Sequence, residues 1–161
     1  MPMRFYSYLL FVLIFFLLKG VPVLAVDVSP SCDHTPTTFS CVKYKKNYDG
    51  DTVTFDIPNV HPLIGKSVSV RVAGIDAPEK KGKKPCEMEK ARDAQRLVEN
   101  LLKNARHIEL KNVKRDKYFR ILAEVLFDGK SLGDTLIKNK LAYEYDGGRK
   151  PSSVDWCRTQ N

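Results

Sequence analysis

One long amphipathic stretch interrupts a series of short strand-like segments, and this order leaves few folds open. In residues 87–104 the apolar side chains recur at spacings of three and four, which predicts a helix with one apolar stripe. Strand-like segments precede it at residues 41–48, 53–57 and 67–73, and an Asp-Gly pair between the first two predicts a hairpin turn. The first half of the chain is therefore expected to form a small antiparallel sheet.

Two more extended segments follow the predicted helix. Residues 107–110 form a short one, and residues 121–127 are apolar on both faces, which is typical of a central strand. Ser131 and Asp134 then favour a capped second helix that ends near Lys140. Five short strands with a helix between the third and the fourth describe an OB-fold barrel. The sequence therefore predicts an α+β, mainly β fold: a five-stranded OB-fold barrel with a second, short helix.

The start of the chain has the pattern of an export signal. Arg4 precedes an apolar run at residues 9–18, and a segment that ends in Ala25 offers small residues to a signal peptidase. The apolar run is short for a membrane span, although an uncleaved anchor remains the alternative. We expect a cleaved signal peptide at residues 1–25, a secreted or periplasmic protein, and no stable membrane association after cleavage.

The charge of the chain indicates a class of partner. The 161 residues carry a formal net charge of +8, and loss of Arg4 and Lys19 with the signal would leave about +6. A basic exported protein attracts polyanions such as nucleic acid, anionic lipid or anionic glycan. Charge alone is equally consistent with simple solubility, so the choice among these partners depends on specific residues.

Four cysteines in an exported chain indicate disulfide bonds, and three pairings are possible. Cys32 and Cys41 enclose a short loop, which favours a local bridge. That pairing would leave Cys86 and Cys157 to tie the C-terminal tail to the body. The expected organisation is a signal peptide at 1–25, a disulfide-linked leader at 26–40, an OB-fold domain at 41–146 and a tail at 147–161.

Two acidic segments lie where predicted strands end. Residues 49–52 read Asp-Gly-Asp-Thr, and residues 71–79 run from an arginine to Asp-Ala-Pro-Glu. Carboxylates are the ligands that hard divalent cations prefer, and a guanidinium group matches the oxygens of a phosphate. Each aspartate alone is an ordinary turn residue. Together with arginine in a basic protein, they indicate a metal ion that acts on a phosphodiester.

With a third segment, Asp-Lys-Tyr-Phe-Arg at residues 116–120, these motifs resemble the staphylococcal nuclease (thermonuclease) family. Their order and approximate spacing agree with that family from about residue 42 to residue 145. The resemblance implies Ca²⁺ as cofactor. Its expected ligands are the carboxylates of Asp51 and Asp76 and the backbone carbonyl of Ala77.

The resemblance also implies roles for the remaining site residues. Glu79 would orient or deprotonate the attacking water, and Arg71 and Arg120 would hold the phosphate and stabilise its developing charge. Lys117 and Tyr118 are expected to contact the terminal phosphate of the nucleotide. Tyr143 or Tyr145 is expected to stack on a base, and packing in the core or at the rim is the alternative for these two tyrosines.

The chain departs from the family pattern at several positions. Ala77 stands where the family has a threonine, and Phe119 stands where it has a glycine before the second arginine. The lysine-containing loop after Glu79 is shorter. The family's C-terminal helix is largely absent, and the chain ends with a segment that contains Trp156 and Cys157. None of these changes removes an acid or an arginine from the expected site.

The expected function is that of a secreted, Ca²⁺-dependent endonuclease. As a phosphodiesterase it would hydrolyse DNA, and by expectation RNA, with little sequence preference, leave 3′-phosphate ends, and act as a monomer. The alternative is a non-catalytic, exported nucleic-acid-binding OB-fold protein, and a structural or adhesion OB-fold is a third reading. Both rivals are disfavoured by the combination of three acids and two arginines, because a binding module does not need paired acids facing its phosphates.

Overall fold

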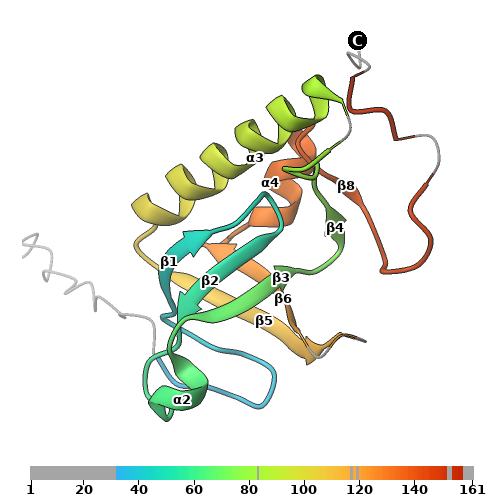
Figure 1. The fold of residues 1–161 in the computed structure, drawn as a ribbon. Helices are drawn as coiled ribbons and strands as arrows, with labels where there is room; N and C mark the ends of the chain where they lie inside the picture. Colours follow the sequence, from blue (N-terminus) through green and yellow to red (C-terminus); the bar gives the residue numbers. More distant parts are fainter. Residues whose placement is uncertain (1–31, 83, 117, 119, 152–153, 158–161) are drawn as a thin grey trace, which may run out of the picture. The chain divides into compact units, whose positions relative to one another are not determined.

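The computed structural model describes residues 32–157 with the exception of 83, 117, 119 and 152–153, and these residues fall in one compact unit of the chain. Figure 1 shows the arrangement of the helices and strands. Their bounds are β1 (Lys43–Asn47), β2 (Thr52–Asp56), α2 (Pro62–Gly65), β3 (Val68–Val72), β4 (Ile75–Asp76), α3 (Pro85–Asn104), β5 (Ile108–Arg115), β6 (Ile121–Phe127), β7 (Lys130–Ser131), α4 (Leu132–Lys138) and β8 (Tyr143–Glu144).

The main strands form a curved sheet in the order β1-β2-β3-β6-β5, in which the β3–β6 pair is parallel and the other pairs are antiparallel. β5 then returns to the segment just before β1. Phe39 and Leu110 exchange two backbone hydrogen bonds of 2.9 Å, and the amide of Val42 donates to the carbonyl of Ile108 at 3.1 Å. The sheet therefore curls back on itself, and the predicted OB-fold is confirmed.

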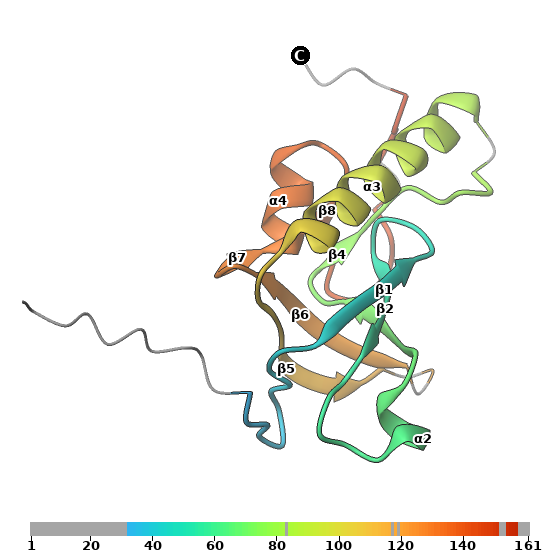
Figure 2. The ribbon, with the colours of Figure 1, turned by 90° about the vertical axis from the view of Figure 1, so that its left-hand side faces the viewer.

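The long helix α3 packs its apolar stripe onto the barrel, next to α4 in both views (Figures 1 and 2). Ala91, Ala94, Val98 and Leu102 are buried, at spacings of three and four residues. Burial of a valine or leucine side chain contributes roughly 1.5–3 kcal/mol, so this face contributes much of the stability of the helix. The helix begins at Pro85, whose fixed φ suits the first turn.

In β3, successive side chains point to opposite faces of the sheet, so only every second side chain reaches the core. Val70 and Val72 are almost fully buried, whereas the residue between them, Arg71, points to the opposite face of the sheet. Arg71 pairs with Thr52 of β2, the residue directly after the Asp-Gly-Asp turn. The sheet register therefore brings the arginine of one predicted motif beside the acids of the other.

Two elements differ from the sequence-based expectations. From the sequence, residues 58–65 are expected to form a loop. In the structure this segment contains the short helix α2, in which the His61 side chain accepts the amide of Leu63 and Pro62 occupies the first turn. β5 continues past Leu110 to Arg115, with an irregular register between Lys111 and Lys114. Four of its five added residues are polar and only Val113 is apolar, so hydrophobic alternation did not predict them.

Both disulfide bonds have the favoured pairing. Cys32 is bonded to Cys41, and Cys86, in the first turn of α3, is bonded to Cys157. The predicted attachment of the C-terminal tail to this helix is therefore confirmed. In the described part of the chain, no helix is both long enough and apolar enough to span a lipid bilayer. The expected signal peptide at residues 1–25 lies outside the described residues.

Candidate active site

The turn between β1 and β2 presents Asp51 to the site. Asp49, itself buried, accepts the backbone amides of Asp51 at 3.1 Å and of Thr52 at 2.8 Å through Oδ1. This Asx-type arrangement fixes the turn. The two aspartates of the Asp-Gly-Asp motif therefore have different tasks: Asp49 shapes the backbone, and Asp51 directs its carboxylate outward from the turn toward β3 and β4.

Arg71 joins the two predicted metal ligands. Its Nη1 lies 2.8 Å from Oδ1 of Asp51, and its Nη2 lies 2.8 Å from Oδ1 of Asp76. One planar guanidinium group thus holds both carboxylates at a fixed separation. Burial lowers the pKa of Arg71, but the charges and hydrogen bonds of the two aspartates outweigh burial and raise the pKa above its ordinary value.

The carboxylate of Asp51 lies in an environment that disfavours its charge. Burial raises the pKa of Asp51 to about 6; Arg71 opposes this shift, and the nearby charges of Asp49 and Asp76 add to it. The second oxygen of Asp51 accepts the backbone amide of Ala77 at 3.0 Å. Asp51 is therefore a buried anion with too little positive charge around it, which is an environment that attracts a cation.

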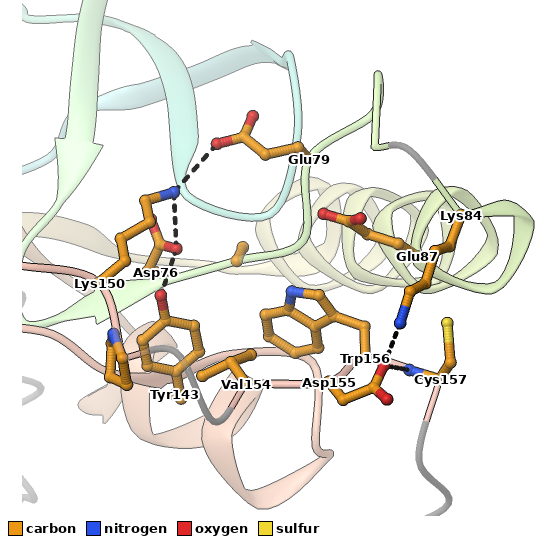
Figure 3. A pocket seen from close by; sticks show the side chains of 12 residues that line it. Asp76, Glu79, Lys84, Glu87, Tyr143, Lys150, Val154, Asp155, Trp156 and Cys157 are labelled. Carbon is orange, nitrogen blue, oxygen red and sulfur yellow. Dashed lines mark hydrogen bonds and ion pairs between the residues drawn. The ribbon is translucent and has the colours of Figure 1, made fainter.

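Asp76 is held by residues from the C-terminal part of the chain. β4 pairs with β8, and this register places Asp76 opposite Tyr143. The Tyr143 hydroxyl donates to Oδ2 of Asp76 at 2.7 Å, and Nζ of Lys150 lies 2.9 Å from the same oxygen (Figure 3). Burial, followed by the hydrogen bond to Asp76, raises the pKa of Tyr143, so its hydroxyl remains a donor at neutral pH.

Glu79 lies beside these groups but is much more exposed. It follows the fully buried Pro78, which anchors the end of the segment after β4. Its side chain is 59% exposed, against 4% for Asp76, and its Oε1 lies 3.3 Å from Nζ of Lys150. A carboxylate that remains accessible to solvent is suited to accept a proton from water.

Arg120 reaches the site from the turn between β5 and β6. Its Nε donates to Oδ2 of Asp116 at 2.8 Å, and its guanidinium lies 5.5 Å from the ring centroid of Tyr118. The other oxygen of Asp116 accepts the backbone amides of Arg120 and Tyr118 at 2.9 and 2.8 Å. The aspartate that begins the third motif therefore shapes this turn and orients the arginine.

A cleft of about 830 Å³ connects these parts. Five basic and four acidic side chains line it, so positive charge for an anionic ligand lies next to acids that could hold a cation. Lys117 and Phe119 lie outside the described residues. The residues of the cleft that bear on phosphate chemistry are Arg71, Asp76, Glu79, Tyr118, Arg120, Tyr145 and Lys150.

The two later tyrosines have clear positions. Tyr143 points its hydroxyl at Asp76, and its ring lies 5.6 Å from the ring of Trp156. Tyr145 lines the cleft, and its hydroxyl donates to the carbonyl of Gly148 at 2.7 Å. Tyr145 is therefore better placed to meet a ligand in the cleft, whereas Tyr143 supports an acid of the site.

The donor set fits a hard divalent cation. Asp51 and Asp76 converge on one guanidinium group, and both are almost fully buried. Among the residues that the structure describes, no group of three His, Cys, Asp or Glu side chains is arranged as a protein cage for a metal ion. Two carboxylates and a carbonyl instead suit a cation such as Ca²⁺ that keeps several water ligands.

Comparison with known proteins identifies the family. The family described as "Staphylococcal nuclease homologue" matches residues 69–155, which is more than half of the chain. The chain therefore belongs to the staphylococcal nuclease family, and the predicted resemblance is confirmed. The matched region includes Arg71, Asp76, Glu79 and Arg120 and begins after Asp51.

Two bacterial relatives are similar to this chain. "Endonuclease YncB" of Bacillus subtilis (strain 168) is 37% identical over 108 residues, which cover 63% of this chain and 48% of the relative. "SPbeta prophage-derived endonuclease YokF" of the same strain is 36% identical over 110 residues, covering 63% of this chain and 34% of the relative. The chain thus spans about half or less of the length of these relatives.

Proposed function

We propose that this protein is a Ca²⁺-dependent nuclease that hydrolyses phosphodiester bonds of DNA and RNA with little sequence preference. The observation that carries the proposal is the pair of contacts by which Arg71 holds Asp51 and Asp76, at the edge of a cleft that also contains Arg120 and Lys150. A simple phosphate-binding surface gains nothing from two buried carboxylates, because they repel the ligand. The names of the two relatives, which are both endonucleases, support the same conclusion.

Asp51, Asp76 and the carbonyl of Ala77 would hold the metal ion. When bound, Ca²⁺ would act as a Lewis acid that offsets the negative charge on the phosphate. Arg71 already occupies one side of the two carboxylates, so their remaining lone pairs and the Ala77 carbonyl are the groups offered to the ion. Arg71 thereby fixes the separation of the ligands and also presents a guanidinium group to the phosphate.

The remaining residues of the site have separate roles in proton transfer and in phosphate binding. Glu79 accepts a proton from water, the water oxygen forms a bond to phosphorus, and the bond between phosphorus and the 5′ oxygen breaks. This leaves a 3′-phosphate on one product. Arg120, held by Asp116 in the same cleft, would donate to the phosphate oxygens as their charge increases. Tyr118 and Tyr145 are the proposed nucleotide contacts in the same cleft.

The proposal includes export. The two disulfides are typical of proteins that fold in an oxidising compartment, and they support a secreted or periplasmic location. The expected signal peptide at residues 1–25 would bring the chain there. We propose that the mature protein acts as a monomer.

The experiment is a plasmid-degradation assay with the purified protein. We expect degradation in the presence of Ca²⁺ and its loss when a Ca²⁺ chelator is added. Glu79→Gln should lower the rate on the order of 10²-fold or more, since that is what a general base contributes. The matched control is Glu89→Gln, on the exposed face of α3, which should keep the wild-type rate. Chelator-resistant cleavage, or equal rates for both variants, would refute the proposed site.

A second assay tests the products and the alternative function. Mass spectrometry of a digested oligonucleotide should show 3′-phosphate ends, and 5′-phosphate ends would contradict the proposed direction of cleavage. A protein that binds DNA tightly but never cuts it, with or without Ca²⁺, would instead be the non-catalytic binding module.

A further inference from the structure

Lys150 places a positive charge among the acids of the site, and no sequence motif pointed to it. Its Nζ lies 2.9 Å from Oδ2 of Asp76 and 3.3 Å from Oε1 of Glu79. Figure 3 shows the ammonium group between these two carboxylates, on the side of Asp76 that also receives the Tyr143 hydroxyl. A single protein cation therefore bridges the proposed metal ligand and the proposed general base.

The segment that carries Lys150 is anchored at both ends. We call residues 146–151 and 154–157 the C-terminal strap. Before it, β8 pairs with β4, and the amide of Tyr145 donates to the carbonyl of Gly74 at 2.9 Å. At its far end, Cys157 is bonded to Cys86 in the first turn of α3. The strap is thus attached to the rest of the fold at both ends.

Two further contacts hold the strap close to the site. Asp155 forms an ion pair with Lys84, the residue just before α3, with 3.1 Å between Oδ1 and Nζ. The ring of Trp156 lies 5.6 Å from the ring of Tyr143, whose hydroxyl in turn bonds Asp76. Because the strap is tethered in this way, the local concentration of the Lys150 ammonium at the two acids is high and does not depend on any ligand.

We propose that Lys150 is a built-in cation that competes with the divalent metal ion for Asp76 while it also pairs with Glu79, and that the Cys86–Cys157 bridge holds it in place. The inference rests on the proposed function, because the competitor is the metal ion of that site. Lysine is charged at neutral pH, and together with the Tyr143 hydroxyl it occupies Oδ2 of Asp76. A metal ion that bound Asp76 through this oxygen would have to displace the lysine, so the strap would lower the metal affinity of the resting protein.

The size of the effect follows from the exposure of the pair. The Lys150 side chain is 50% exposed, so its interaction with the acids is partly screened. An exposed ion pair contributes up to about 1 kcal/mol, which corresponds to roughly fivefold in an equilibrium constant. Removal of this charge should therefore strengthen Ca²⁺ binding by about that factor.

Isothermal titration of the purified protein with CaCl₂, without nucleic acid, tests the inference. Lys150→Met should bind Ca²⁺ about fivefold more tightly than wild type. Lys150→Arg keeps the charge and should bind with nearly the wild-type affinity. The matched control is Lys130→Met, an exposed lysine of β7, which should leave the affinity unchanged. Thermal melting followed by circular dichroism checks that every variant is folded.

The bridge is tested with the Cys86→Ser/Cys157→Ser double variant. Release of the strap should lower the local concentration of Lys150 at the two acids. The double variant should therefore bind Ca²⁺ more tightly than wild type, as Lys150→Met does. Tighter binding by Lys150→Met with no change in the double variant would overturn the role of the bridge. An unchanged Ca²⁺ affinity in Lys150→Met would overturn the competition itself.

The outcomes separate this inference from the proposed function. If DNA is cut with Ca²⁺ but Lys150→Met and wild type bind the ion equally, the inference fails and the nuclease function stands. If Lys150→Met binds Ca²⁺ more tightly and no form cuts DNA, the inference stands and the nuclease function fails. If Lys150→Met binds a short single-stranded DNA more weakly than wild type and its Ca²⁺ affinity is unchanged, Lys150 is a substrate contact, and the inference is overturned.

Discussion

Gly50 is the residue at which the active-site turn touches the rest of the fold. A Cβ atom added at this position would lie 2.8 Å from the Cβ of Ala94 in α3 and 2.9 Å from the Cβ of Ala77 after β4. Carbon atoms in contact prefer separations of about 3.5–4.0 Å, so Gly50→Ala forces these segments apart by roughly 1 Å. Both neighbours are short and rigid, so the backbone must move.

The expected cost of Gly50→Ala comes from this overpacking. An extra methyl group in a well-packed region costs about 1–3 kcal/mol, and two simultaneous clashes put the expected loss of unfolding free energy near the upper value. The same shift separates Asp51 from Ala77, whose amide donates to its carboxylate at 3.0 Å. We therefore expect nuclease activity to fall together with stability.

Urea unfolding followed by far-ultraviolet circular dichroism measures the loss. Ala94→Gly removes the nearer of the two clashing atoms and costs about 1 kcal/mol by helix propensity alone. The Gly50→Ala/Ala94→Gly double variant should be more stable than the sum of the single effects predicts, by at least about 0.5 kcal/mol. Gly74→Ala is the control, because its Cβ would meet nothing within 4 Å, and it should show no coupling to Ala94→Gly. Strict additivity for Gly50→Ala would refute the packing argument.

The remaining predictions concern the acids and their partners. The pKa of Asp51 is about 6 in the folded protein and about 3.9 in an unfolded chain. The stabilising contribution of Asp51 to the free energy of unfolding is therefore fully present below about pH 4, and it is lost as the pH rises through about 6. In urea unfolding with chelator present, Asp51→Asn should gain stability over wild type as the pH rises from about 4 to 7, and parallel pH profiles would contradict this. Tyr143→Phe removes a donor to Asp76 and should lower the unfolding free energy by about 1.5 kcal/mol, more than Tyr145→Phe does; equal losses would argue against the hydrogen bond. Arg71→Met leaves two buried carboxylates without their shared partner and should cost about 3 kcal/mol or more. Adding Asp51→Asn should recover part of that loss, and no recovery would show that the cost arises elsewhere.

The framework of the site could be predicted from the sequence because it depends on strand ends. Alternation placed Arg71 on the face opposite Val70 and Val72, and the turn signals placed Asp51 and Asp76 where strands stop. Strand ends predict that the two aspartates lie close together, but Arg71 was expected to hold the phosphate, and its contact with both carboxylates was not predicted. The structure brings these three residues into direct contact.

The partners from distant, polar segments could not be predicted. Lys150 belongs to a tail without periodicity and lies 71 residues from Glu79 in the sequence, so no local pattern places them together. Asp116 was visible as the first residue of a motif, but its three hydrogen bonds to the turn depend on the local backbone conformation. Aspartate side chains often accept backbone amides two to four residues later in the chain, so the position of Asp116 before Tyr118 and Arg120 could have predicted this turn.

The closure of the barrel has a consequence for the order of folding. Phe39 and Val42 complete the sheet only by pairing with β5, which leaves the ribosome long after they do. Pairing over such a distance in sequence is slow, because the chain must lose the entropy of a large loop before any hydrogen bond forms. Until then, the edge of β1 remains open to strands of other molecules. The nascent chain is therefore exposed to aggregation through this edge until residues 108–110 have been synthesised and paired.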